Sequence, residues 1–214
     1  MAASRRVTKV LVPVVLVVVL AFAFWRSVHS ARSEAYKLSR DTQKPWHLAV
    51  AMATRPNDPV LVLEPPSDLT HELFDQVFRR SMESMQAPEQ PGIPLVLAVE
   101  LARAGAARPT PEDLLAMARA AGLEAAPPVP RCLAHRRLPE PETRSQMYFA
   151  LFDSPAFDAF RANLAARLGA GFDAGFVSPA MFIGLIESTL PRFLPLHADA
   201  AKDCVAPITV AAGT

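Results

Sequence analysis

The sequence has little of what marks a metal site or a familiar catalytic centre. It contains two cysteines, Cys132 and Cys204, and neither lies in a Cys-x-x-Cys motif. Its five histidines form no HxH, HxxxH or HExxH spacing, and no GxSxG or phosphate-loop motif is present. These absences leave no residue that the sequence alone identifies as catalytic, as a metal ligand or as a cofactor ligand. We therefore expect no cofactor and lean towards a protein that is not an enzyme.

A strong excess of positive charge is missing as well. The chain carries a net charge of +1, but residues 1–40 hold seven Lys/Arg and one acidic residue, a net charge of +6. Residues 41–214 hold fifteen Lys/Arg and twenty acidic residues, a net charge of −5. A mildly acidic domain lacks the clustered basic surface that nucleic acid requires. The basic amino-terminal part suits the anionic headgroups of a lipid bilayer, which we expect as a partner.

Two cysteines leave two interpretations open. Outside the cytoplasm, Cys132 and Cys204 form a single disulfide that closes a long loop and stabilises the fold by about 3–4 kcal/mol on the loop-entropy estimate. In the alternative interpretation, both remain buried free thiols.

The longest apolar run lies near the amino terminus, from Val10 to Trp25, and contains no charged residue. Its sixteen residues span about 24 Å as a helix, against about 30 Å for the hydrocarbon core of a bilayer. Lys9 and Arg26 flank the run and can extend towards the headgroups, and Trp25 falls where interfacial aromatic residues gather. The sequence therefore predicts a transmembrane helix within residues 1–26, with Lys9, Trp25 and Arg26 at the membrane interfaces.

A cleaved signal peptide is the competing interpretation of this segment. It has a basic start, an apolar middle and small residues in Ala21-Phe22-Ala23, although that motif lies inside the apolar run. A short basic amino terminus before a first apolar segment stays in the cytoplasm as a rule. We therefore expect a single-pass protein of a bacterial-type inner membrane, with its carboxy-terminal domain in the periplasm.

The remaining chain divides into two parts. Residues 27–45 are polar with helical spacing of their apolar residues, which predicts a juxtamembrane helical stalk or linker. Residues 46–214 form one domain of ordinary size. The range 93–103 is ambiguous between strand and helix, and we favour helix. Alternation and capping signals predict strands over 46–52, 60–63, 131–138, 147–152, 180–186 and 205–210, and helices over 68–85, 93–103, 110–122 and 154–168.

This order of elements predicts an α+β fold. We expect an antiparallel or mixed sheet with helices packed on it, joined to the amino-terminal transmembrane helix.

Three stretches of the carboxy-terminal half resemble the carboxy-terminal lobe of 2H phosphoesterases. They read MYFALFDSPAFDAFRANLAARL, FDAGFVSPAMFIGL and CVAPITV. The resemblance implies two His-x-Thr/Ser motifs acting on a 2′,3′-cyclic phosphate or a related phosphodiester. Here Ala180-Met181-Phe182 stands at one motif and His47-Leu48-Ala49 at the other, so the resemblance implies a degenerate descendant.

The leading hypothesis is a membrane-anchored protein whose extracytoplasmic domain binds another membrane or periplasmic protein. It would be an accessory, structural or assembly subunit of a membrane complex. The alternative is a degenerate 2H-phosphoesterase-like enzyme or a small-ligand-binding domain tethered to the membrane. His47 and His135 fall on predicted strands and are the residues that a proton-transfer pair would use.

Overall fold

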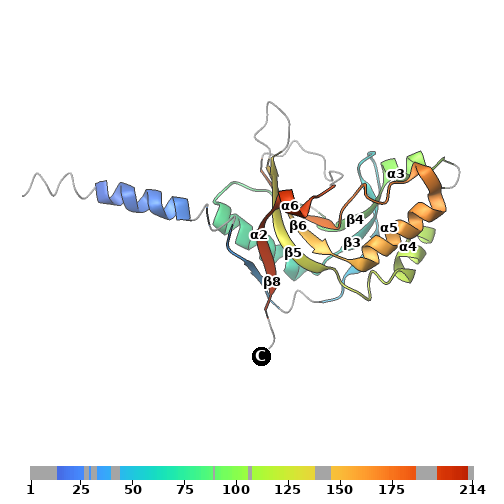
Figure 1. Ribbon diagram of the computed structural model, residues 1–214, viewed down its shortest axis with the longest axis horizontal. Helices are drawn as coiled ribbons and strands as arrows, with labels where there is room; N and C mark the ends of the chain where they lie inside the picture. The colour runs from blue at the N-terminus through green and yellow to red at the C-terminus, as the bar shows by residue number, and fades with distance from the viewer. Residues whose placement is uncertain are drawn as a thin grey trace, which may run out of the picture.

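The computed structural model describes residues 14–26, 29, 33–39, 44–88, 90–105, 108–137, 146–186 and 197–211. It shows an α+β domain with a five-stranded mixed sheet, in the order β1-β8-β5-β6-β7, and a three-stranded antiparallel sheet, in the order β2-β3-β4 (Figure 1). The strands are β1 (Tyr36–Leu38), β2 (His47–Val50), β3 (Pro59–Glu64), β4 (Ile93–Leu97), β5 (Val129–Arg137), β6 (Gln146–Asp153), β7 (Ala180–Ile186) and β8 (Cys204–Val210). The helices are α2 (Ser67–Ser81), α3 (Ala98–Arg103), α4 (Pro111–Ala120), α5 (Pro155–Leu168) and α6 (Ala200–Asp203), and η3 (Gly169–Gly171) is a 3₁₀ turn. The predicted α+β class is confirmed.

The predicted transmembrane helix is wrong. Residues 14–26 form a helix that extends away from the domain (Figure 1). The thirteen described residues of this helix rise about 20 Å, because each adds about 1.5 Å. Among the described residues, none of the helices has both the length and the apolar character that crossing a bilayer requires. Trp25 and Arg26 are exposed and are the last described residues of this helix before a break in the description. Lys9 lies outside the described residues.

Part of the range expected as a stalk or linker belongs to the sheet. Tyr36–Leu38 forms β1, which pairs in parallel with β8, so Tyr36 lies opposite Ile208 and Leu38 opposite Val210. The side chains of Tyr36 and Leu38 are buried in the main core. Burial raises the pKa of the Tyr36 hydroxyl to about 12, although the Arg80 guanidinium above its ring acts in the opposite direction.

Polar side chains of α2 cover the outer edge of β1. Glu72 accepts the backbone N–H of Ser39 at 3.0 and 3.1 Å and the Ser39 hydroxyl at 2.9 Å. Gln76 bonds both main-chain groups of Lys37, and Arg80 donates to the carbonyl oxygens just before the strand. These three residues recur every fourth position, so they form one row along the helix. An edge strand covered in this way is unavailable for pairing with another chain.

We expect Glu72→Ala to lower the free energy of unfolding by about 1–2 kcal/mol, because the half-buried N–H and hydroxyl of Ser39 lose their shared acceptor. Denaturant unfolding measures this loss, and amide hydrogen exchange at Ser39 should become faster. Glu112→Ala, at an exposed carboxylate on α4, is the control and should change stability far less. Equal effects of the two substitutions would show that the Glu72 row does not hold β1.

The five-stranded sheet has a core on each face. The larger core joins one face to α2, α5 and the smaller sheet, and includes Leu73, Phe160 and Ile183. The smaller core lies among Cys132, Phe149, Phe182 and neighbouring residues, with α6 packed against it. α6 therefore covers the face of the sheet that α2 does not.

The predicted helix over residues 93–103 is wrong in its first half. Ile93–Leu97 is strand β4, antiparallel to β3, and all five of its residues are buried. Only Ala98–Arg103 is helical. A short apolar run that is buried on both sides carries no periodicity, so its local pattern does not separate strand from helix.

Candidate functional site

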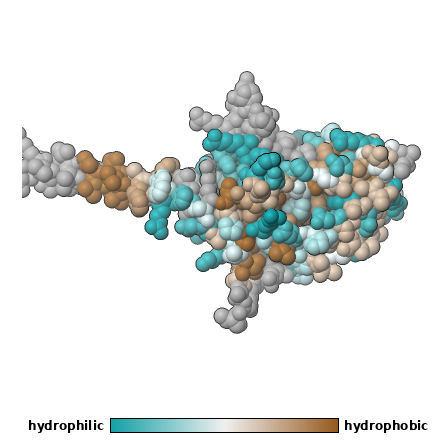
Figure 2. All heavy atoms as spheres, in the orientation of Figure 1, coloured by the Kyte–Doolittle hydropathy of each residue, from teal (hydrophilic) through white to brown (hydrophobic). Residues whose placement is uncertain are grey.

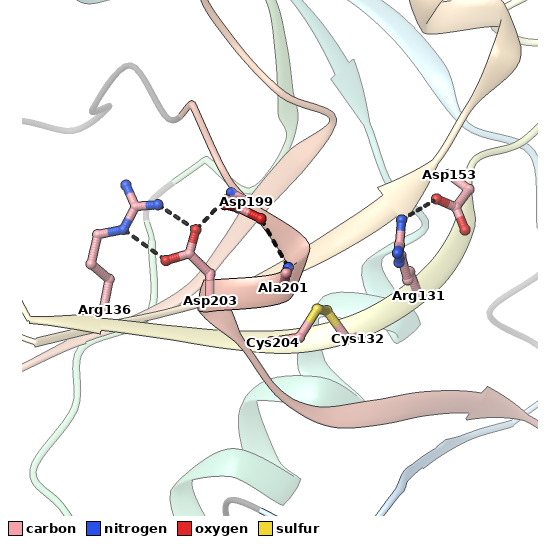
Figure 3. The surroundings of a disulfide bond; sticks show 8 residues. All are labelled: Arg131, Cys132, Arg136, Asp153, Asp199, Ala201, Asp203 and Cys204. Atoms are coloured by element: carbon pink, nitrogen blue, oxygen red, sulfur yellow. Dashed lines mark hydrogen bonds and ion pairs between the residues drawn. A yellow bond between two sulfur atoms is a disulfide. The ribbon is translucent and has the colours of Figure 1, made fainter.

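The two cysteines are joined in a disulfide between β5 and the start of β8 (Figure 3). The Cα atoms of Cys132 and Cys204 are 5.7 Å apart, and 72 residues separate them in the sequence. Cys132 is buried in the smaller core. The bond therefore fixes α6 and β8 to the centre of the sheet.

Ionic contacts hold α6 in the same place (Figure 3). Arg136 on β5 binds Asp203 through two nitrogen atoms, with Nε–Oδ1 at 3.2 Å, and also donates to the carbonyl of His197. The Asp203 carboxylate also accepts the backbone N–H of Asp199 at 2.8 Å. Hydrogen bonds from the side chain of Lys202 and from the backbone lower the pKa of Asp199. The Arg136–Asp203 pair therefore attaches the segment to the sheet, whereas Asp199 and Lys202 bond within the segment.

A second ion pair lies inside the domain, between Arg161 on α5 and Glu100 on α3. The two side chains are 1% and 2% exposed, and their closest atoms, Nη2 and Oε1, are 2.7 Å apart. Glu100 also accepts the backbone N–H of Leu97 at 2.9 Å. The guanidinium lies 4.4 Å from the centre of the Phe172 ring.

All five N–H donors of Arg161 have acceptors. Two bonds reach Glu100, and the others reach the backbone carbonyls of Leu95, Asp173 and Ala174. A guanidinium with no spare donor binds nothing further. The pair therefore joins α3, α5, β4 and the loop after η3, and its role is structural.

The histidines of the proton-transfer hypothesis lie on different sheets. His47 is exposed on β2 of the smaller sheet, whereas His135 lies on β5 of the larger one. His135 bonds Gln146 at 2.8 Å and lies against the Tyr148 ring, and Tyr148 in turn donates to Glu83 at 3.2 Å. His135 is thus part of a polar cluster at one end of β5 and β6. Among the described residues, no group of His, Cys, Asp or Glu has a metal-binding arrangement.

One polar hollow of 290 Å³ lies beside the start of α5, near the disulfide. Ser154 caps α5 there by accepting the backbone N–H of Phe157 at 3.2 Å. Arg131 and Asp153 line the hollow and form an ion pair with each other at 3.3 Å, and both are more than half exposed (Figure 3). An exposed pair of this kind is weak and well solvated. These groups supply a helix cap and a surface ion pair.

A second hollow, of 330 Å³, is lined, among the described residues, by apolar side chains. It lies between the start of β5 and the end of β8. Trp46, which is 1% exposed, forms part of its floor. Its lining residues are Trp46, Leu69, Pro127, Pro128, Val129, Pro130 and Val210.

The helix over residues 14–26 carries most of the exposed large apolar side chains of the described chain. Figure 2 shows it as a predominantly apolar rod beside a mixed domain surface. All thirteen residues are exposed, and large apolar side chains such as Leu16, Leu20 and Phe24 expose 57–61% of their area. A helix that is apolar on every side is stable only where another apolar surface covers it.

Comparison of the chain with protein-family models, curated proteins and solved structures finds no match. The resemblance to 2H phosphoesterases therefore remains an inference from the three stretches quoted above. The structure places Ala180–Phe182 at the start of β7 and His47–Ala49 on β2.

Proposed function

We propose that this protein is a non-enzymatic accessory or assembly subunit that binds another protein of a membrane complex, with its α+β domain outside the cytoplasm. The observation that carries the proposal is the exposed apolar helix over residues 14–26. Burying a Val, Leu or Phe side chain completely is worth about 1.5–3 kcal/mol. The half-exposed side chains of this helix together represent on the order of 10 kcal/mol that a partner surface can recover.

The disulfide supports a location outside the cytoplasm. Disulfides persist in oxidising compartments such as the periplasm and are rare in the cytosol, where thiols are kept reduced. The bond between Cys132 and Cys204 is integral to the sheet rather than a surface feature, because Cys132 is 4% exposed. A domain that needs this bond is best suited to an oxidising compartment.

The arrangement of the ionisable groups supports a binding role. The most deeply buried charges, Arg161 and Glu100, are consumed in a structural network. Arg136 and Asp203 are similarly engaged in holding α6. These buried charges therefore hold the fold together, and the exposed apolar helix over residues 14–26 is the feature that suits binding to a protein.

Site-specific photo-crosslinking in the cells that make the protein tests this proposal. A photoreactive amino acid at Leu16, Leu20 or Phe24 should give one discrete crosslinked protein, which mass spectrometry identifies. The same reagent at Glu112, an exposed residue of α4, is the matched control and should not give that product. Crosslinks to lipid alone from the apolar helix, or no crosslink at all, would contradict the proposal.

A further inference from the structure

The apolar hollow of the domain lies in a gap between two neighbouring strands. Pairing of β5 with β8 begins at Cys132, which lies opposite Pro207. Before Cys132, β5 follows β6, with Val129 opposite Asp153. Beyond Pro207, β8 follows β1. Residues 129–131 of β5 therefore do not pair with residues 208–210 of β8, and the hollow lies beside this unpaired stretch.

A proline lies on each strand next to the gap. Pro130 on β5 and Pro207 on β8 have no backbone N–H, so neither donates to a hydrogen-bond ladder at this position. Successive residues of a strand direct their main-chain groups to opposite sides. Within residues 208–210, which pair with β1, the groups that do not face β1 therefore face the gap. The main-chain groups of residues 208–210 that do not face β1 therefore have no ladder partner on β5.

Trp46 adds one hydrogen-bond donor, its indole N–H, to the lining of the hollow. Its ring packs edge-on against Phe152, with the ring centres 5.3 Å apart. Within the described part of the chain, its indole N–H has no acceptor, although every fully enclosed polar side-chain atom has a partner. The N–H therefore reaches the surface, and the hollow is the surface cavity that Trp46 lines. A donor that is otherwise 99% buried and unpaired favours a ligand with an acceptor.

The lining of the hollow restricts its occupant. None of the described residues that line it has an ionisable side chain, which disfavours a charged ligand. Its 330 Å³ is at the small end of ligand pockets, which range over about 300–1,000 Å³. An extended peptide matches all of these properties, because it brings small apolar side chains together with regularly spaced carbonyl oxygens and N–H groups.

We propose that this hollow binds an extended, uncharged segment of a partner protein. One or two apolar side chains of that segment occupy the space between Val129 and Val210, and one of its backbone carbonyls accepts the indole N–H of Trp46. The inference rests on the proposed function in taking the ligand to be a protein. It adds a second contact surface, on the domain, that is separate from residues 14–26.

Nuclear magnetic resonance of the indole N–H tests this inference directly. The chain has two tryptophans, so Trp25→Phe leaves Trp46 as the sole indole signal. The probe is a capped heptapeptide with leucine or proline at alternating positions and threonine between them, titrated into the full-length protein in mild detergent. We expect a saturable downfield shift of the Trp46 indole proton as it becomes hydrogen-bonded. Absence of any shift up to the solubility limit of the peptide would overturn the inference.

Two matched variants locate the binding. Val129→Asp, at a 61% exposed position on the rim, should weaken binding about tenfold or more, which corresponds to about one hydrogen bond or one poorly solvated charge. Val50→Asp, at a 50% exposed position on β2, should leave the affinity unchanged. Equal losses in the two variants, or no loss with Val129→Asp, would contradict the placement of the peptide.

Two further controls separate other occupants. If 1-hexanol alone reproduces the saturable shift and the peptide does not, the hollow takes small apolar molecules and the peptide inference is wrong. If the indole signal moves with protein concentration in the absence of peptide, a second copy of the chain occupies the hollow and the inference is also wrong. Photo-crosslinking from residues 14–26 is independent of these results, so failure here would leave the proposed function standing.

Discussion

Arg161→Met should lower the free energy of unfolding by about 3–5 kcal/mol, the largest effect we expect from a single substitution. Methionine keeps most of the volume of the side chain but leaves the Glu100 carboxylate buried at 2% exposure without its partner. It also leaves the carbonyls of Leu95, Asp173 and Ala174 without their donor. Urea or thermal unfolding followed by circular dichroism measures the loss.

Arg167→Met is the matched control on the same helix. Arg167 is half exposed, and its ion pair with Asp113 spans 3.7 Å. An exposed pair contributes about 0–1 kcal/mol, so this variant should remain close to the parent in stability. The double variant Arg161→Met/Glu100→Leu should regain part of the loss, because it removes the unpaired charge. A loss of about 1 kcal/mol or less for Arg161→Met would show that the buried pair does not hold the domain together.

Removal of the disulfide should have the second-largest effect. The loop between Cys132 and Cys204 spans 72 residues, for which the loop-entropy relation gives about 4 kcal/mol. The variant Cys132→Ala/Cys204→Ala should therefore unfold at a much lower denaturant concentration than the oxidised parent. Reduction of the parent with dithiothreitol should produce nearly the same shift.

The variant itself supplies the control, because dithiothreitol has no bond to reduce in it and should leave its unfolding curve unchanged. A thiol assay establishes that reduction of the parent is complete. If the fully reduced parent retained the stability of the oxidised protein, the disulfide would not be a structural requirement. The reason for placing the domain in an oxidising compartment would then disappear.

Local patterns in the sequence predicted several elements correctly. Thr110 caps α4 with a reciprocal bond to Asp113, and Ser154 caps α5 just before Pro155, as the capping signals indicated. The paired strands β5 and β6 lie where alternation placed them. Each of these features depends on residues within a few positions of one another, so the signal and its structural cause are both local.

The buried ion pair has only a weak signal in the sequence. Arg161 lies on the buried side of α5 with Phe157, Phe160 and Leu164, a charged residue on an otherwise apolar stripe. That position indicates a buried charge but not its partner, because Glu100 is 61 residues away. The partner became evident only when α3 and α5 were packed together.

The apolar run near the amino terminus shows the limits of composition. Its hydropathy predicted a transmembrane helix, whereas the helix over residues 14–26 is too short to meet that expectation. The exposed apolar surface remains, and it is the observation on which the proposed binding to a protein rests.

The sequence by itself determined the α+β class, the helix caps and most of the strands, because these follow from neighbouring residues and from composition. It also limited the chain to one possible disulfide, because there are only two cysteines. Tertiary structure decided the rest. It placed β1 beside β8 across 172 residues, directed the row on α2 against that edge, and placed Trp46 in the lining of an apolar hollow. These features arise when segments distant in sequence compete for the same core and edges, and no local pattern records which of them meet.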